Sequence, residues 1–394
     1  MTTMDTQDFM RELEASSPHG NGAAPAGGSP KDPAAAKDKQ GGMLALIRRA
    51  NPKHLEPMED QGWFGPDSVT RRVWAYPTGM TIGFSRSVVV EELDPFLIAP
   101  VKSSSKIYSQ TRVRYDRTLR YFATYLFADS GKIAKASNVL TKVHARAASP
   151  DPVSGLISDP NNPDEQLWIH MTAWHSILYT YEVYGPGRLS EAEEREFWAD
   201  CATAAHAQTI DPDRVPRSRD EVREYFRLMR PRLAASEATQ EAMDHLTRID
   251  AIYPVAPAIM KPGFWLFGKL FRVAVIATLP RWQRDLANLR QSRILDVAIR
   301  PVMKALLRIA DTSPRIKLAL IAIASPSTVP IAGPMLMGIP PLSDEVLTPE
   351  ETYRRHGLPT PTELYAELGH DQSVVVYPPS SPVPPEVADL YAVG

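Results

Sequence analysis

The sequence contains a single cysteine, Cys201, among its 394 residues. One cysteine excludes intramolecular disulfide bonds, a zinc site built from several thiolates and the two-cysteine attachment of c-type haem. Any bound metal must therefore rely on His, Asp or Glu side chains. The chain also has no excess of positive charge, since its formal net charge is -2 at pH 7. We therefore expect no nucleic-acid partner.

A basic start followed by an apolar run is absent from the N-terminus, so we expect no secretory signal and a cytoplasmic location. Large apolar residues are almost missing between Ser16 and Gly42, and such a stretch cannot bury enough surface to fold. We therefore expect a disordered tail over residues 1–60, one helical domain over 61–345 and a Pro-rich C-terminal tail over 346–394.

Apolar residues in the middle of the chain recur at intervals of three and four rather than two, which predicts an all-α fold. The helices predicted most clearly cover residues 107–128, 132–147, 165–184, 190–208, 219–230 and 237–249. One strand-like run, Ser373 to Tyr377, lies in the Pro-rich tail and is at most a marginal strand.

Residues 261–317 are strongly basic, with twelve Lys or Arg, three Asp and therefore an excess of nine positive charges interleaved with aromatic residues. Two interpretations stay open. These helices either pack on the first half of the domain and turn their cations to solvent, or lie on an anionic membrane surface. Residues 318–339 are apolar but interrupted by Pro326, Pro330 and Pro334, so we expect a buried helix followed by an extended wall or lid.

Histidine is the natural metal or haem ligand in this chain, which has nine histidines. Helical spacing puts His144 on one stripe with Leu140 and Ala147, so its imidazole is predicted to face inward. By itself this pattern favours a hydrogen-bonded core histidine. His170 and His175 lie on a segment that is apolar on every side. Five residues apart, they are rotated by about 140° and cannot both bind one metal, and each is more simply a core histidine.

Arg114 and Thr118 share one face of the helix before His144, and Tyr121 and Tyr125 continue that face. This polar stripe fits a solvated helix. It also fits the polar edge of a pocket, where the arginine would pair with a carboxylate such as a haem propionate.

Other metal chemistries find little support in the sequence. A di-iron carboxylate bundle needs two Glu-x-x-His motifs, and the one match, Glu367 to His370, lies in the C-terminal tail. Zinc-protease, nucleotide-binding and hydrolase motifs are absent, and Cys201 lacks the Gly-rich loop that presents a thiolate to haem. Elimination leaves non-covalent haem with a histidine ligand, or no cofactor.

A series of landmarks resembles a known family in order and spacing. They are Gly65-Pro-Asp-Ser68 with Trp74, Arg114-x-x-x-Thr118, His144, Asp159-Pro160 before Trp168-Ile-His170, Tyr181 to Gly185, Val215-Pro216, Tyr225, and Leu279-Pro280 with Arg281 or Arg284. In these features the sequence resembles the MpaB-type oxygenases and the catalytic domain of the latex-clearing proteins, the rubber oxygenases. The resemblance runs from about Gly62 to Pro341.

The resemblance implies a globin-like haem-binding core at about residues 105–250, with additional basic and apolar helices at about 260–340. Its rubber-cleaving members bind haem b and use dioxygen to cut isoprenoid double bonds. Carried over by position, the proximal iron ligand is His144. His170 and then His175 follow as alternative cofactor-binding residues, and Arg114 and Thr118 become cofactor-binding and catalytic pocket residues.

The sequence departs from the family at two positions. Asp94-Pro95 stands where the family often has His-Pro. Arg117 stands where rubber-cleaving relatives can carry a lysine that closes the sixth iron position, and a protonated guanidinium is a poor ligand, so we expect an open distal side. Glu91, Glu92 and Asp94 are candidates for the acid or base.

These patterns together predict an oxidoreductase. The leading hypothesis is a haem-b-dependent oxygenase that acts with dioxygen on a hydrophobic small molecule, an isoprenoid or another natural product. Two alternatives stay open, a haem-binding sensor without turnover and a cofactor-free helical scaffold or membrane-surface protein. Peripheral membrane contact is expected, if anywhere, through residues 261–317.

Overall fold

The structure, a computed structural model, describes residues 51–95, 97, 110–147, 149–150, 157–253 and 258–368. Among these residues the only strands are β1 (Ser149–Pro150) and β2 (Ile157–Ser158), which pair antiparallel. The fold class is therefore all-α, as the periodicity predicts. The predicted N-terminal tail as far as residue 50 and the strand-like run from Ser373 to Tyr377 lie outside the described residues.

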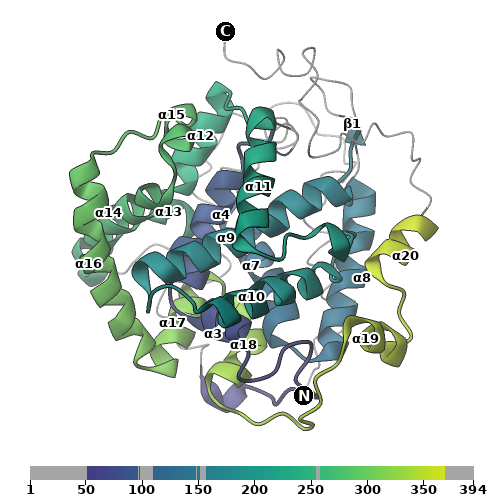
Figure 1. Cartoon of the computed structure of the whole chain (residues 1–394). Helices are drawn as coiled ribbons and strands as arrows, with labels where there is room; N and C mark the ends of the chain where they lie inside the picture. The colour runs from purple at the N-terminus through teal and green to yellow at the C-terminus, as the bar shows by residue number, and fades with distance from the viewer. Residues whose placement is uncertain are drawn as a thin grey trace, which may run out of the picture.

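The helices are arranged around a central one (Figure 1). Their bounds are α3 (Val69–Ala75), α4 (Phe84–Glu91), α7 (Thr111–Phe127), α8 (Ser130–Ala147), α9 (Pro163–Tyr184), α10 (Glu191–Ala205), α11 (Arg219–Met229), α12 (Glu237–Leu246), α13 (Ile249–Ile252), α14 (Lys261–Thr278), α15 (Arg281–Leu286), α16 (Arg293–Asp311), α17 (Pro314–Ala324), α18 (Val329–Leu336), α19 (Pro349–His356) and α20 (Pro361–Glu367).

The central helix is α9, which packs against α3, α4, α10 and α16. Its sequence is apolar on every side, and side chains such as Trp168 and Trp174 are completely buried. The helix begins where Asn162 accepts a hydrogen bond from the Asp164 N–H at 2.8 Å, with Pro163 in the first turn. An all-apolar helix is stable only in the middle of a core, and this is where α9 lies.

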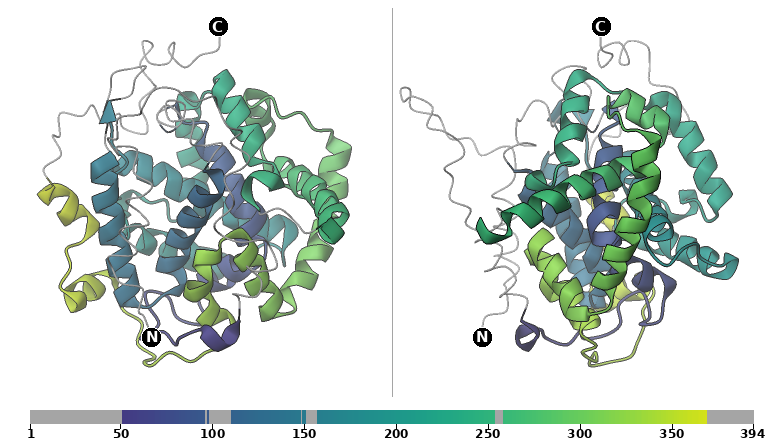
Figure 2. Two further views of the ribbon diagram at one scale, coloured as in Figure 1. Left: turned by 180° about the vertical axis from the view of Figure 1, so that it is seen from behind. Right: turned by 90° about the vertical axis from the view of Figure 1, so that its left-hand side faces the viewer.

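Helices α14 and α16 pack against each other at the edge of the molecule opposite α8, α19 and α20 (Figures 1 and 2). No helix among the residues that the structure describes is long and apolar enough to cross a membrane.

The expected extended wall after α17 is wrong. Residues 326–328 form a 3₁₀ turn, and α18 follows directly as a second short helix. Pro330 lies in the first turn of α18, where its missing N–H would have had no intrahelical partner, and Pro334 is accommodated within a helix of only eight residues. Prolines here start a helix rather than prevent one.

The folded chain continues past residue 345, where the Pro-rich tail was expected to begin. Helices α19 and α20 both pack on α8. Each starts with a capping box, from Thr348 with Glu351 and from Thr360 with Glu363, and a proline in its first turn. Local capping thus forms helices in a segment that its proline content marks as a tail.

Candidate functional site

His144 and Arg114 lie at the same end of a helical hairpin. Helices α7 and α8 are joined by a short turn at Ala128 and Asp129, so they run in opposite directions away from it. Arg114 lies 13 residues before the end of α7 and His144 lies 14 residues after the start of α8, about 20 Å along each helix. The fold therefore brings the two predicted site residues to one level of the hairpin.

The His144 ring is half-buried against the turn that precedes α9. Its Nδ1 atom lies 3.4 Å from Nε2 of Gln166. Burial lowers the pKa of His144 to about 4, while the charge of Asp159 and hydrogen bonds with Asn161 and the Pro160 carbonyl act in the opposite direction. The imidazole is therefore neutral at pH 7, which is the form that binds a metal.

The turn that holds His144 is itself fixed by a hydrogen-bond network. Asn161 Nδ2 donates to the Thr141 carbonyl on α8 at 2.8 Å. Gln166 donates to the Pro160 carbonyl at 2.9 Å and accepts from the Thr209 N–H at 2.8 Å. These contacts fix the segment against which the His144 ring lies.

Arg114 and Thr118 are exposed on α7, whereas the rest of their stripe is enclosed. Tyr121 donates to the Ala207 carbonyl, and Tyr125 is buried beside it with ring centroids 5.8 Å apart. The predicted stripe thus runs from an open end to the core. At its open end it has a cation and a hydroxyl close to the level of His144.

Two adjacent carboxyls at the end of α4 have strongly raised pKa values. Burial raises the pKa of both Glu91 and Glu92 to about 7, while Arg114 acts to lower both. Glu91 accepts from Ser87 Oγ at 2.6 Å and from Thr172 Oγ1 at 3.3 Å. Oε2 of Glu92 is buried without a hydrogen-bond partner in the described part of the chain. Such a carboxyl changes protonation state near neutral pH.

The third carboxylate proposed as acid or base from the sequence, Asp94, has a different environment. It forms a buried ion pair with Arg232 at 3.1 Å, so its charge is compensated. Glu165, near this pair, has its pKa raised to about 8 by burial and by the charge of Asp94. Sequence reasoning did not select Glu165, because its burial depends on contacts between distant segments.

His170 is a core residue. Its Nε2 donates to the Cys201 carbonyl at 2.9 Å, and burial lowers its pKa to about 4. Nδ1 then has no partner among the described residues and is completely enclosed. This arrangement corresponds to the simpler of the two interpretations given from the sequence.

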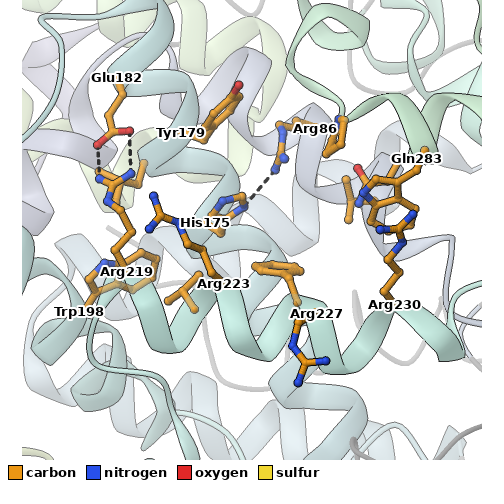
Figure 3. A pocket seen from close by; sticks show the side chains of 16 residues that line it. Arg86, His175, Tyr179, Glu182, Trp198, Arg219, Arg223, Arg227, Arg230 and Gln283 are labelled. Atoms are coloured by element: carbon orange, nitrogen blue, oxygen red, sulfur yellow. Dashed lines mark hydrogen bonds and ion pairs between the residues drawn. The ribbon is translucent and has the colours of Figure 1, made fainter.

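His175 points in another direction, as the rotation between the two histidines predicts, and lines a pocket between α4, α9, α10, α11 and α15 (Figure 3). The cavity has a volume of about 420 Å³. Its lining consists of Arg86, Val90, His175, Leu178, Tyr179, Glu182, Trp198, Arg219, Val222, Arg223, Phe226, Arg227, Arg230, Pro280, Trp282 and Gln283. Burial and the charges of Arg86 and Arg219 hold the pKa of His175 well below its usual value.

The pocket arginines were missed by sequence reasoning. Arg219, Arg223 and Arg227 recur at intervals of four and so share one face of α11, which was a usable signal. The same spacing is common on solvated helices. Arg86 gave no signal, because contacts of α4 with α9 and α14 bury it.

No group of three or more His, Cys, Asp and Glu side chains that could hold a metal ion occurs in the described parts of the chain. A metal cofactor that carries most of its own ligands needs only one side chain from the protein. The neutral imidazole of His144, which lies against Gln166, is able to supply that one ligand.

Comparison with known proteins identifies the family of the chain. No curated protein and no solved structure matches the chain. The family model described as "ER-bound oxygenase mpaB/B'/Rubber oxygenase, catalytic domain" matches residues 71–310, well over half of the 394 residues. The chain therefore belongs to the family of MpaB and rubber oxygenase catalytic domains.

Proposed function

We propose that this oxygenase domain is haem-b-dependent and uses dioxygen on a hydrophobic isoprenoid or natural-product substrate, with His144 as the proximal ligand. The observation that carries the proposal is the state of His144, which is neutral and oriented by the fixed turn before α9. His175 is less suited, because the positive charges of Arg86 and Arg219 near it would repel a metal cation. His170 is less suited because its ring is completely buried in the core beside Trp174.

The residues near His144 suit a haem. Arg114 and Thr118 are exposed at the same end of the hairpin, where the guanidinium would pair with a propionate and the hydroxyl would line the cofactor. When bound, haem b would supply the dioxygen chemistry, and the protein would supply the proximal ligand and the orientation.

Glu92 is the residue we propose as the acid or base. A carboxyl with a pKa of about 7 both accepts and releases a proton at neutral pH, and the unpartnered Oε2 of Glu92 is available for that exchange. Glu91 contributes a like charge that raises the pKa of Glu92, while Arg114 limits the rise. Asp94 is excluded from this role by its ion pair with Arg232.

The ligand assignment is tested by His144→Gly in the full chain with added haemin. We expect this variant to lose the Soret band, and added imidazole, which fills the space left by the side chain, to restore it. His175→Gln is the matched control and should keep the band. A Soret band that is unchanged in His144→Gly, or lost in His175→Gln, would contradict the assignment.

We also propose that the domain docks on an anionic membrane surface through α16 and the start of α14. Helix α16 buries Ile299, Met303 and Leu307, yet its outer side is apolar as well, with Ile294 80% and Val297 67% exposed. An apolar surface that continues along one helix is typical of an interaction site, whereas scattered single residues are not. The outward-facing side chains of this segment are thus apolar as well as basic.

The positive charge of the exposed residues on α14 and α16 indicates that the partner is an anionic surface. Exposed basic residues accompany the apolar ones, namely Arg293, Arg300, Lys304 and Arg308 on α16 and Lys261 and Lys269 on α14. On α14, Trp265 is 64% exposed and lies 5.7 Å below the Lys269 ammonium. Tryptophan and lysine together suit the boundary between lipid headgroups and acyl chains, and cytoplasmic leaflets carry the anionic lipids that basic residues bind.

Flotation with vesicles tests this docking. We expect the full chain to float with vesicles of phosphatidylcholine and phosphatidylserine and to float poorly with phosphatidylcholine alone. Ile294→Asp with Val297→Asp should abolish flotation. The control Leu342→Asp changes another residue, 66% exposed, outside this surface and should have no effect. Absence of binding to anionic vesicles, or an equal loss in the control, would refute the docking.

A further inference from the structure

The pocket beside His175 has a charge distribution that the proposed oxygenase chemistry does not use. Five arginines and one glutamate line it. Three of the arginines have carboxylate partners, since Arg219 binds Glu182 and Glu194, Arg223 binds Asp220, and Arg227 binds Glu224. Arg86 and Arg230 have no carboxylate partner among the described residues.

Arg86 is the more informative of the two, because it is only 3% exposed. Its donors reach neutral groups, the Ser176 hydroxyl at 2.6 Å and the Thr278 carbonyl at 3.3 Å. Nη2 has no acceptor within the described part of the protein. A buried guanidinium without a counter-ion is costly, and an anion that enters the pocket would compensate its charge.

His175 adds a donor on the same side. Nη1 of Arg86 lies 3.5 Å from its Nδ1, and the two side chains point toward each other in Figure 3. Because a guanidinium only donates, Nδ1 is the acceptor and the proton of the neutral ring is on Nε2. This tautomer is assigned from the contact, and it leaves Nε2–H as a further donor.

The remaining walls are apolar and aromatic. Arg86 lies over the Tyr179 ring at 5.2 Å, and Arg230 lies over the Trp282 ring at 4.8 Å at the rim. Phe226, Leu178 and Val222 complete the apolar surface. A cavity of about 420 Å³ with apolar walls and a few polar groups, among them the buried Arg86 guanidinium, has the size and character of a small-molecule site.

We propose that this pocket binds an amphipathic organic carboxylate, with the carboxylate on Arg86 and Arg230 and the hydrocarbon body against the aromatic walls. The site is separate from the one assigned to haem. Gln166, which contacts His144, precedes Tyr179 by 13 residues of α9, or about 20 Å along the helix. The pocket does not depend on the haem proposal.

Calorimetric titration of the full chain with naphthalene-2-carboxylate tests the proposal, and naphthalene-2-carboxamide is the neutral control of the same shape. We expect the carboxylate to bind and the carboxamide to bind at least about tenfold more weakly, because the anion is what Arg86 lacks. Inorganic phosphate, which has no apolar body, should also bind at least about tenfold more weakly. Equal binding of all three, or no binding of the carboxylate, would overturn the proposal.

Variants locate the binding. Arg86→Gln should weaken carboxylate binding about tenfold or more, and Arg230→Gln, at an exposed position, by roughly threefold to tenfold. Arg290→Gln removes the same charge at an exposed position outside the pocket and should change the affinity by less than about twofold. If Arg86→Gln does not fold, the proposal is decided by carboxylate binding to Arg230→Gln and by carboxamide binding to the native chain. Unchanged binding in Arg230→Gln and in any folded Arg86→Gln would refute the assignment.

A last experiment tests whether carboxylate and haem bind at different sites. The carboxylate should bind equally before and after haemin is added. Loss of binding on addition of haemin would assign the pocket to the haem propionates and overturn the separate site. If the chain binds no haem but still binds the carboxylate, the haem proposal fails and the pocket remains.

Discussion

Glu165 is a buried carboxyl whose ionisation opposes folding. Its pKa is raised from 4.5 to about 8 by burial and by Asp94. The unfolded chain therefore releases this proton from about pH 4.5, while the folded chain keeps it until about pH 8. Between these values the folded state binds more protons, so the free energy of unfolding decreases as the pH rises.

Glu165→Gln should remove this dependence. The difference in free energy of unfolding between the variant and the native chain should increase by about 1–4 kcal/mol in favour of the variant when the pH is raised from about 5 to about 9. The reason is that glutamine has no proton to lose. The measurement is the melting temperature at both pH values, with the exposed Glu237→Gln as control. A difference between variant and native chain that does not change with pH would contradict the raised pKa.

Glu92 leads to a prediction about activity. With a pKa of about 7, a base at this position becomes competent as the pH rises, so turnover should increase through about pH 7. Glu92→Gln should lower kcat by about 10²-fold or more, because the proton-transfer group is lost. Glu91→Gln should keep most activity. It should move the midpoint of the pH profile downward, because removal of the like charge lowers the pKa of Glu92. An unchanged profile in both variants would exclude the pair from proton transfer.

Individual residues were predictable to different degrees. The stripe around His144 indicated an inward ring, and the structure gives a half-buried, neutral one. Its proposed role as a ligand came from the family resemblance, since periodicity does not distinguish ligation from a core hydrogen bond. Arg86 was not predictable, because its burial results from contacts between α4, α9 and α14.

Helix α4 and the π-helical turn before it (Gly79–Gly83) pack closely on α9, and Gly83 is the contact point. A Cβ atom at this position would lie 2.6 Å from Thr180 Oγ1 and 2.9 Å from Ile177 Cδ1. Thr180 cannot easily move away, because its hydroxyl bonds the Ser176 carbonyl at 2.9 Å. The close approach of the two elements thus requires glycine.

Gly83→Ala should destabilise the protein by about 1–3 kcal/mol through overpacking. Gly263→Ala in α14 is the matched control, because a Cβ atom there meets no other atom within 4 Å, and alanine should be neutral or stabilising by up to about 1 kcal/mol. Chemical denaturation of both variants measures the two effects. Equal stability of the two would show that the contact is loose.

At the level of elements, local signals predicted the helices well where the periodicity is strong. The predicted helix at 165–184 corresponds to α9 (Pro163–Tyr184), and the one at 219–230 to α11 (Arg219–Met229). The prediction failed at 326–336, because prolines were taken only as helix breakers although Pro330 is in a first turn. Spacing along the sequence says little about which side of a helix another helix covers.

At the scale of the whole molecule, α9 connects two regions of different chemistry. Its first turns hold the network around His144, and its last turns line the arginine pocket. The all-α class followed from the spacing of apolar residues, but the separation of these regions along one helix required the tertiary structure. The globin-like arrangement of the core stays a prediction.

The most direct test of the central claim is the absorption spectrum of the full chain, purified after expression with adequate haem supply. We predict a Soret band that co-purifies with the protein, because the neutral imidazole of His144 is able to bind iron. A folded, helical protein that shows no Soret band, even after haemin is added, would contradict the proposal that this oxygenase domain uses haem.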